Sequence, residues 1–91
     1  MIISNHAYER AELRLNLSPP AFARHVKRIQ EKGRRHDDFH GPLRRYMDSL
    51  FFRYATKEIW IYGEFLYPLA HDNTMPTVLR VPQHLKKYLK R

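Results

Sequence analysis

The stretch EIWIYGEFLYPL, residues 58 to 69, contains two apolar runs that only a Gly-Glu dipeptide separates. Both runs are rich in aromatic and β-branched residues, which favour extended strands. A gap of this length fits a hairpin, since a crossover to a parallel strand needs a much longer connection. The stretch therefore predicts two adjacent antiparallel strands, and with them a sheet in this half of the chain.

Two further segments extend the predicted sheet. YMDSLFFRY (residues 46–54) precedes the hairpin and TVLRV (residues 77–81) follows it, and both have the composition of strands. The connections between the segments are short, so we expect about four antiparallel strands within residues 43–81. Residues 34–42, RRHDDFHGP, are polar and end in Gly-Pro, which predicts a loop.

Helical patterns occupy the first third of the chain, at residues 5–15 and 18–32. Ser18 followed by Pro19 is a helix-start signal, and the apolar residues of the second helix recur with the period of a helix. The C-terminal stretch PQHLKKYLKR predicts a short basic helix. The expected fold is a single α+β domain over residues 1–91, in which two N-terminal helices pack on a roughly four-stranded antiparallel sheet.

The composition limits the functions and partners that this protein can have. The chain has 17 Lys and Arg against 9 Asp and Glu, a formal net charge of +8, which favours nucleic acid, an anionic membrane surface or an acidic protein as partner. The absence of cysteine excludes disulfides and thiolate metal sites and agrees with a cytoplasmic location. The longest apolar run is too short to span a bilayer and the start lacks a signal-peptide pattern, so we expect a soluble protein without a membrane partner.

Cofactor and metal signals are weak in this sequence. It contains neither a Gly-rich phosphate loop nor a Gly-x-Ser-x-Gly motif, which argues against a cofactor-dependent enzyme. HDDFH, from His36 to His40, has the residue types of a metal site. Its position in a polar loop beside two arginines favours an ion-paired surface instead, and we expect no metal and no cofactor.

His6, Arg10 and Arg14 lie four residues apart in the first predicted helix and would form one stripe along it. An imidazole beside two permanent cations is unfavourable unless an anion is bound there. Arg offers a planar fork of donors for phosphate oxygens, and His can move a proton near neutral pH. The spacing thus fits a catalytic phosphate site, and the alternative is the solvated side of a short helix in a basic protein.

The first hairpin strand predicts two different faces for the sheet. Ile59 and Ile61 would point one way while Trp60 and Tyr62 point the other. We expect the isoleucines to face the helices, which leaves Trp60 and Tyr62 available to stack single-stranded bases. The alternative is that Trp60 completes a second small core under the C-terminal helix.

Further basic residues would attract a polyanion. Arg53 and Arg80 fall in predicted strands and would add positive charge to the aromatic face of the sheet. Lys86, Lys87 and Lys90 cluster near the C-terminus and form the electrostatic footprint of a polyanion-binding segment. An ordinary solvated tail is the alternative.

The stretch HAYERAELRLNLSP resembles the opening of small bacterial toxin-like domains of the barnase–EndoU–colicin–RelE superfamily of ribonucleases. Many members begin with a helix carrying His-Ala, Arg and Arg, continue with a second helix that starts at Ser or Thr, and end in a four-stranded antiparallel sheet. A late strand there commonly carries Thr-Val, which Thr77 and Val78 match here. The resemblance covers the order of the elements over most of the chain.

This resemblance implies metal-independent cleavage of RNA by transphosphorylation, in which the ribose 2′-hydroxyl attacks its neighbouring phosphate. It implies that His6 is the general base or acid, that Arg10 and Arg14 stabilise charge on the phosphate, and that Thr77 donates a hydrogen bond to it. An acidic antitoxin or immunity protein would then be a partner. The alternative function is a non-catalytic nucleic-acid-binding or protein-interaction module of phage or mobile-element origin.

Overall fold

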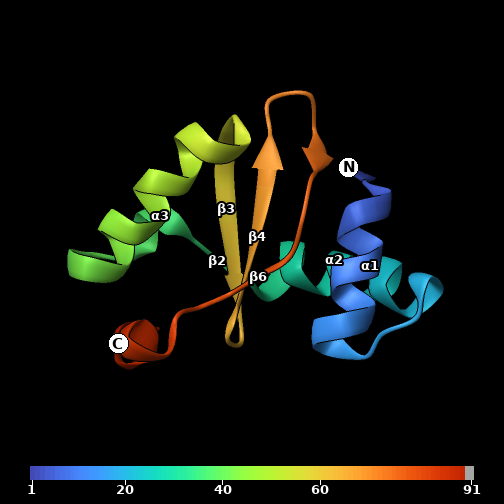
Figure 1. Cartoon of the computed structure of the whole chain (residues 1–91), viewed down its shortest axis with the longest axis horizontal. Coiled ribbons are helices and arrows are strands. Elements are labelled where there is room, and N and C mark those ends of the chain that lie inside the picture. The colour runs from blue at the N-terminus through green and yellow to red at the C-terminus, as the bar shows by residue number, and fades with distance from the viewer. Residues whose placement is uncertain (90–91) are drawn as a thin grey trace.

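The computed structural model describes residues 1–89, in which helices on either side enclose a central sheet (Figure 1). In chain order the elements are β1 (Ile2–Ile3), α1 (Asn5–Leu15), α2 (Pro19–Lys32), β2 (Arg34–Arg35), the 3-10 helix η1 (His36–Asp38), α3 (Gly41–Tyr54), β3 (Thr56–Tyr62), β4 (Phe65–Ala70), β5 (Thr74–Met75), β6 (Leu79–Arg80) and the 3-10 helix η2 (Gln83–Leu89). The predicted α+β class is confirmed. Within residues 1–89, no helix combines the length and the apolar character that a membrane crossing requires.

The predicted hairpin is confirmed and forms the centre of the sheet. β3 and β4 pair antiparallel, from Thr56 opposite Ala70 to Tyr62 opposite Phe65, and the strand order is β2-β3-β4-β6. Gly63 adopts a φ of +63° in the two-residue turn between them, a conformation that glycine reaches without steric cost. β2 and β6 are short strands that pair antiparallel with β3 and β4, so the hairpin sets the register of the whole sheet.

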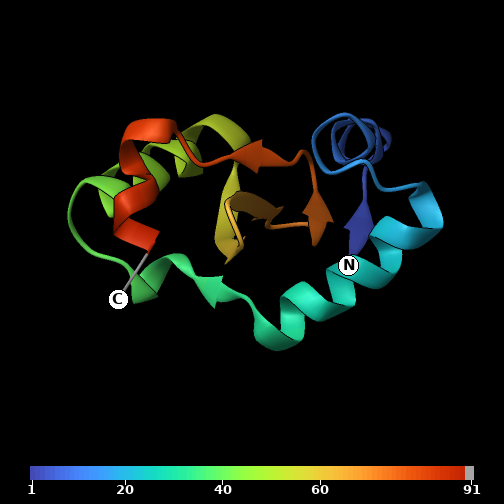
Figure 2. The same ribbon diagram turned by 90° about the horizontal axis from the view of Figure 1, so that it is seen from below.

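Helices cover both faces of this sheet (Figure 1 and Figure 2). Trp60 and Tyr62 pack with the core residues of α1 and α2, and Trp60 is only 8% exposed. Ile59 and Ile61 pack with the core residues of α3 and η2. The predicted alternation of side chains along β3 is therefore right, but the isoleucines face α3 and η2 and not the N-terminal helices. The Trp60 face is covered by α1 and α2, so it is neither open nor under the C-terminal helix as predicted. Because helices cover both sides of the sheet, β3 has no solvent-exposed face.

Residues 46–54 belong to α3 and not to a strand, which corrects the prediction for this segment. The buried residues of α3 are Leu43, Met47 and Leu50, and their spacing has the period of a helix. The aromatic composition favoured a strand, but packing of the apolar stripe against the sheet overrides composition. The Gly-Pro pair that was expected to end a loop starts this helix instead.

Three smaller segments also differ from the predicted fold. Arg34–Arg35, expected in a loop, form the edge strand β2. Of TVLRV only Leu79–Arg80 form a strand, so Thr77 precedes β6; the proline before Thr77 has no N–H to donate to a ladder. The predicted C-terminal helix is the 3-10 helix η2, whose Leu85 is buried in the core. Residues 90–91 of that prediction lie outside the described residues.

The chain between β5 and β6 ties α1 to the sheet at both ends of the helix. β1, which leads into α1, pairs in parallel with β5. Ser4 then donates its N–H to the carbonyl of Met75 at 3.1 Å and its hydroxyl to the carbonyl of Pro76 at 2.9 Å. In the last turn of α1, Arg14 donates to the carbonyl of Val78. These bonds hold α1 alongside the segment that leads into β6.

Replacing Ser4 with alanine removes both the N-cap of α1 and the bond to the Pro76 carbonyl. We expect Ser4→Ala to lower the free energy of unfolding by about 1–2 kcal/mol, since a lost cap and a carbonyl without its partner both destabilise. Ser49→Ala is the matched control, because the exposed Ser49 only donates to the carbonyl of Tyr46 within α3. Its effect should stay within about 0.5 kcal/mol. Chemical denaturation measures the free energy of unfolding of both variants. Equal losses in Ser4→Ala and Ser49→Ala would contradict the role of Ser4.

Candidate functional site

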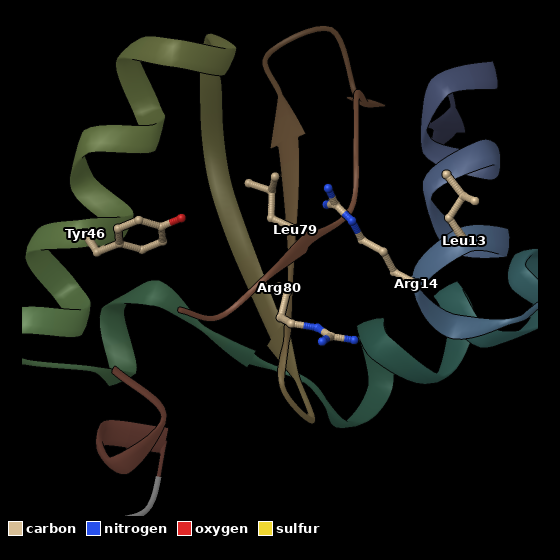
Figure 3. A pocket seen from close by; sticks show the side chains of 5 residues that line it. All are labelled: Leu13, Arg14, Tyr46, Leu79 and Arg80. Atoms are coloured by element: carbon tan, nitrogen blue, oxygen red, sulfur yellow. The ribbon is translucent and has the colours of Figure 1, made fainter. Parts of the chain in front are cut away.

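A groove opens between α1 and α3, with β6 between them. Its volume is about 480 Å³, and it is lined by Leu13 and Arg14 of α1, Tyr46 of α3, and Leu79 and Arg80 of β6. Figure 3 shows these side chains around β6, with the guanidinium of Arg80 pointing away from Tyr46. Arg14 extends from α1 toward β6, and the hydroxyl end of Tyr46 points toward the same strand. We call this site the arginine groove.

Both arginines of the arginine groove are held by contacts that leave donors available. Arg14 is half-buried and donates through Nη1 to the carbonyl of Val78. The guanidinium of Arg80 lies 5.4 Å from the centroid of the Phe65 ring, a cation–π contact that holds the charge beside the hairpin. A guanidinium carries more N–H donors than either contact uses. The remaining donors can therefore bind an anion.

The positive charges of the arginine groove have no acidic counterpart in its lining. None of the five lining residues is acidic, and none of the ion pairs within residues 1–89 involves Arg14 or Arg80. Two like charges that share a groove repel each other, and a bound anion relieves this repulsion. Because Arg binds phosphate oxygens with paired donors, the groove is suited to a phosphate group.

The predicted stripe of His6, Arg10 and Arg14 winds around α1, so His6 and Arg14 point in different directions. Arg14 follows the buried Ala7 by seven residues, so the two side chains lie only about 20° apart around the helix axis, whereas His6 lies about 100° from Ala7. His6 is exposed, and its Nε2 accepts a hydrogen bond from Nε of Arg10 at 3.3 Å. Of these three residues, Arg14 lines the arginine groove.

Thr77 is close to this site in sequence but is not among the lining residues. Its side chain is buried, with 3% exposure. The next residue, Val78, provides the carbonyl that accepts from Arg14. The segment around Thr77 therefore positions an arginine, and the structure does not bring Thr77 and His6 together in the arginine groove.

The aromatic and basic residues predicted on the sheet have different locations. Trp60 is buried, and its indole N–H donates to Oε1 of Glu58 at 3.1 Å. The prediction of an exposed Trp60 that stacks bases is wrong, because α1 and α2 cover it. Tyr62 is half-buried at the end of β3, near the hairpin turn. Arg53 is exposed on α3 and not in a strand, so it does not share a sheet face with Tyr62.

The basic C-terminal segment makes contacts within the protein. Nζ of Lys86 lies 3.3 Å from Oε2 of Glu64 in the hairpin turn, and Nζ of Lys87 lies 5.4 Å from the ring centroid of Tyr88. The ion pair joins η2 to the turn and reduces the charge that this segment offers to a polyanion. Lys90 lies outside the described residues.

The predicted loop from His36 to His40 does not form a cluster of metal ligands. Nε2 of His36 lies 2.8 Å from Oδ1 of Asp37, and its ring packs edge-on against Phe51 with centroids 4.6 Å apart. Across the described residues 1–89, no three His, Asp or Glu side chains are arranged to hold a metal ion.

A second pocket surrounds His25 of α2. Its volume is about 270 Å³, and it is lined by Leu17, Ala21, Arg24, His25 and Arg28. Nε2 of His25 lies 3.4 Å from the hydroxyl of Tyr67, and its ring meets that of Tyr62 edge-on with centroids 5.5 Å apart. Sequence reasoning did not single out this site. Its one signal is a histidine between two arginines that lie one helical turn apart. We call it the His25 pocket.

The surroundings of His25 disfavour the charged form of its imidazole. Desolvation by burial lowers the pKa of His25 from its ordinary value of 6.5, and the charge of Arg28 lowers it further. Burial raises the pKa of Tyr67 well above its ordinary value, and Tyr62 adds to this effect. The Tyr67 hydroxyl therefore keeps its proton and can share a hydrogen bond with a neutral imidazole.

A His25→Gln variant tests this interpretation through the pH dependence of stability. The folded-state pKa of His25 lies below the unfolded-state value, so the unfolded chain binds more protons as the pH falls below about 6.5, and the folded state is destabilised. We expect the Tm of the wild type to fall more than that of His25→Gln between about pH 7.5 and about pH 5. His84→Gln, which alters an exposed histidine of η2, should keep the wild-type response. Identical responses of all three proteins would contradict the interpretation.

Comparison of the chain with known protein families, with curated proteins and with solved structures finds no match. The resemblance of residues 6–19 to toxin-like ribonucleases thus stays a prediction. The function is inferred from the chemistry of the arginine groove and from the charge of the chain.

Proposed function

We propose that this domain binds RNA and that the arginine groove holds a phosphate group of its backbone. The observation that carries the proposal is that Arg14 and Arg80 both line one groove whose lining contains no carboxylate. The net charge of +8 attracts a polyanion, and phosphate contacts supply much of the affinity for nucleic acids. The resemblance of residues 6–19 to toxin-like ribonucleases favours RNA over DNA.

The other lining residues suit the parts of a nucleotide next to the phosphate. The hydroxyl of Tyr46 can donate to a phosphate oxygen or to the ribose 2′-hydroxyl. Leu13 is 74% exposed and, with Leu79, offers apolar surface to a sugar or a base. The groove thus combines charge from two elements with a hydroxyl from a third, an arrangement that binds a backbone without reading its sequence.

Arg80→Ala tests the proposal directly. We expect weaker binding of every RNA sequence alike, and a salt dependence (log K against log salt) that is shallower by about 0.7, because one phosphate contact is lost. Arg53→Ala is the matched control, since it removes the same charge from an exposed position on α3 outside the groove lining. Fluorescence anisotropy at several salt concentrations measures both variants. If the two variants bind equally well, the net charge and not the arginine groove accounts for binding.

A second candidate function is metal-independent cleavage of the bound RNA, and the contact between His6 and Arg10 favours it. Nε2 of His6 lies 3.3 Å from Nε of Arg10, so a possible proton acceptor and a permanent cation stand side by side on α1. A neutral imidazole can take the proton of a ribose 2′-hydroxyl. The 2′-oxygen then bonds to the adjacent phosphorus, the bond between phosphorus and the 5′-oxygen breaks, and the 5′-oxygen takes a proton from water. Arg10 would stabilise the charge on the phosphate. Thr77 is buried and would not contact the phosphate.

His6→Gln separates cleavage from binding. Glutamine can still accept from Arg10 but cannot act as a base, so we expect cleavage to slow by about 100-fold or more while RNA affinity stays within about twofold, because phosphate contacts dominate affinity. His84→Gln, on η2, should cleave like the wild type. Gel analysis of labelled RNA in the presence of a chelator measures the rate. Wild-type cleavage by His6→Gln, or no cleavage by the wild type itself, would leave RNA binding as the function.

A further inference from the structure

We propose that the His25 pocket is a second phosphate subsite for the same RNA, so that the domain binds single-stranded RNA across the turn of its hairpin. The inference rests on the proposed function, because the arginine groove supplies the first phosphate contact. It names the kind of RNA that is bound and adds residues of α2 and β3 to the interface.

A series of contacts connects the arginine groove to the His25 pocket. Arg80 lies 5.4 Å from the ring centroid of Phe65, and Phe65 is the register partner of Tyr62 beside the turn. The ring centroid of Tyr62 lies in turn 5.5 Å from that of His25. Phe65 and Tyr62 are both half-buried, so part of each side chain faces solvent. The two basic sites therefore flank an aromatic edge formed by Phe65 and Tyr62.

The His25 pocket has the features of a site for an anion. Arg24 and Arg28 lie one turn apart on α2, and both are exposed. Their charges repel each other, and none of the ion pairs within residues 1–89 includes either of them. The lining contains no acidic residue. A phosphate that accepts from both guanidinium groups would relieve the repulsion.

His25 is positioned before any ligand arrives. The hydroxyl of Tyr67 lies 3.4 Å from its Nε2, and the ring of Phe22 packs against it with centroids 6.4 Å apart. Burial lowers the pKa of His25, so the imidazole would contribute a hydrogen bond and not a charge. The arginines supply the charge, and His25 helps to orient the phosphate between them.

The aromatic edge selects single strands over duplexes. A base can stack on the exposed part of Tyr62 or Phe65 only if it is not already paired and stacked in a helix. Basic sites on both sides would hold the phosphates that flank such a base. A duplex could use the two basic sites but would gain nothing from the rings between them.

Binding of an RNA oligonucleotide of mixed sequence, single-stranded or annealed to its complement, tests the inference by fluorescence anisotropy. We expect the wild type to prefer the single strand. Tyr62→Leu should weaken single-strand binding about fivefold or more through lost stacking, and Arg28→Gln should make the salt dependence shallower by about 0.7. Lys27→Gln, which removes an exposed charge of α2 outside the pocket lining, is the control and should change affinity less than twofold. Circular dichroism verifies that each variant is folded.

The outcomes separate this inference from the proposed function. If the wild type binds neither RNA form at low salt, the proposed function fails, and this inference fails with it. If Arg80→Ala weakens binding while Arg28→Gln behaves like Lys27→Gln, the arginine groove binds RNA and the second subsite is refuted. Equal affinity for the single strand and the duplex refutes the role of the aromatic edge. Because Arg28 is exposed, its variant gives a decisive result even if Tyr62→Leu does not fold.

Discussion

The attachment of α1 to the chain between β5 and β6 is the constraint on which the candidate site depends. Pro76 and Val78 lie between the strands β5 and β6, and their carbonyls accept from Ser4 and Arg14 of the α1 region. Buried backbone carbonyls need such partners, so the attachment has a structural reason. The attachment also shapes the candidate site, because it holds Arg14 beside β6, where it lines the same groove as Arg80.

The hairpin of β3 and β4 separates two hydrophobic cores. One core lies toward α1 and α2 and the other toward α3 and η2, and alternate side chains of β3 enter each. In this arrangement the middle of the hairpin is buried on both faces. At the turn, Tyr62 and Phe65 are only half-buried, so aromatic surface is available to a ligand there, between the arginine groove and the His25 pocket.

The ion-paired basic residues and the pocket arginines of this protein differ in their surroundings. Arg44 and Lys86 form ion pairs with Asp48 and Glu64, and such exposed pairs neutralise charge locally while adding little stability. The arginines that line the two pockets have no acidic residue in the same lining. Positive charge without acidic neighbours in a concave site is unfavourable when no ligand is bound, but it attracts a polyanion. The linings of the arginine groove and the His25 pocket together contain four arginines and no carboxylate.

The sequence alone was sufficient for α1, α2 and the hairpin, because their signals are local: the caps Ser4 and Ser18, a helical apolar stripe, and a Gly-containing turn between two apolar runs. It also pointed to Arg14 and Arg80 as separate candidates for binding. The helix α3 was missed because its aromatic composition favoured a strand. The sequence left open whether Trp60 is buried and did not identify α1 and α2 as the helices that cover it, because this depends on how the helical layers pack on the sheet. Only the tertiary structure could bring Arg14, Tyr46 and Arg80 together and place His25 against Tyr62 and Tyr67. Residue periodicity describes one element at a time, whereas these distances depend on how distant elements pack against one another.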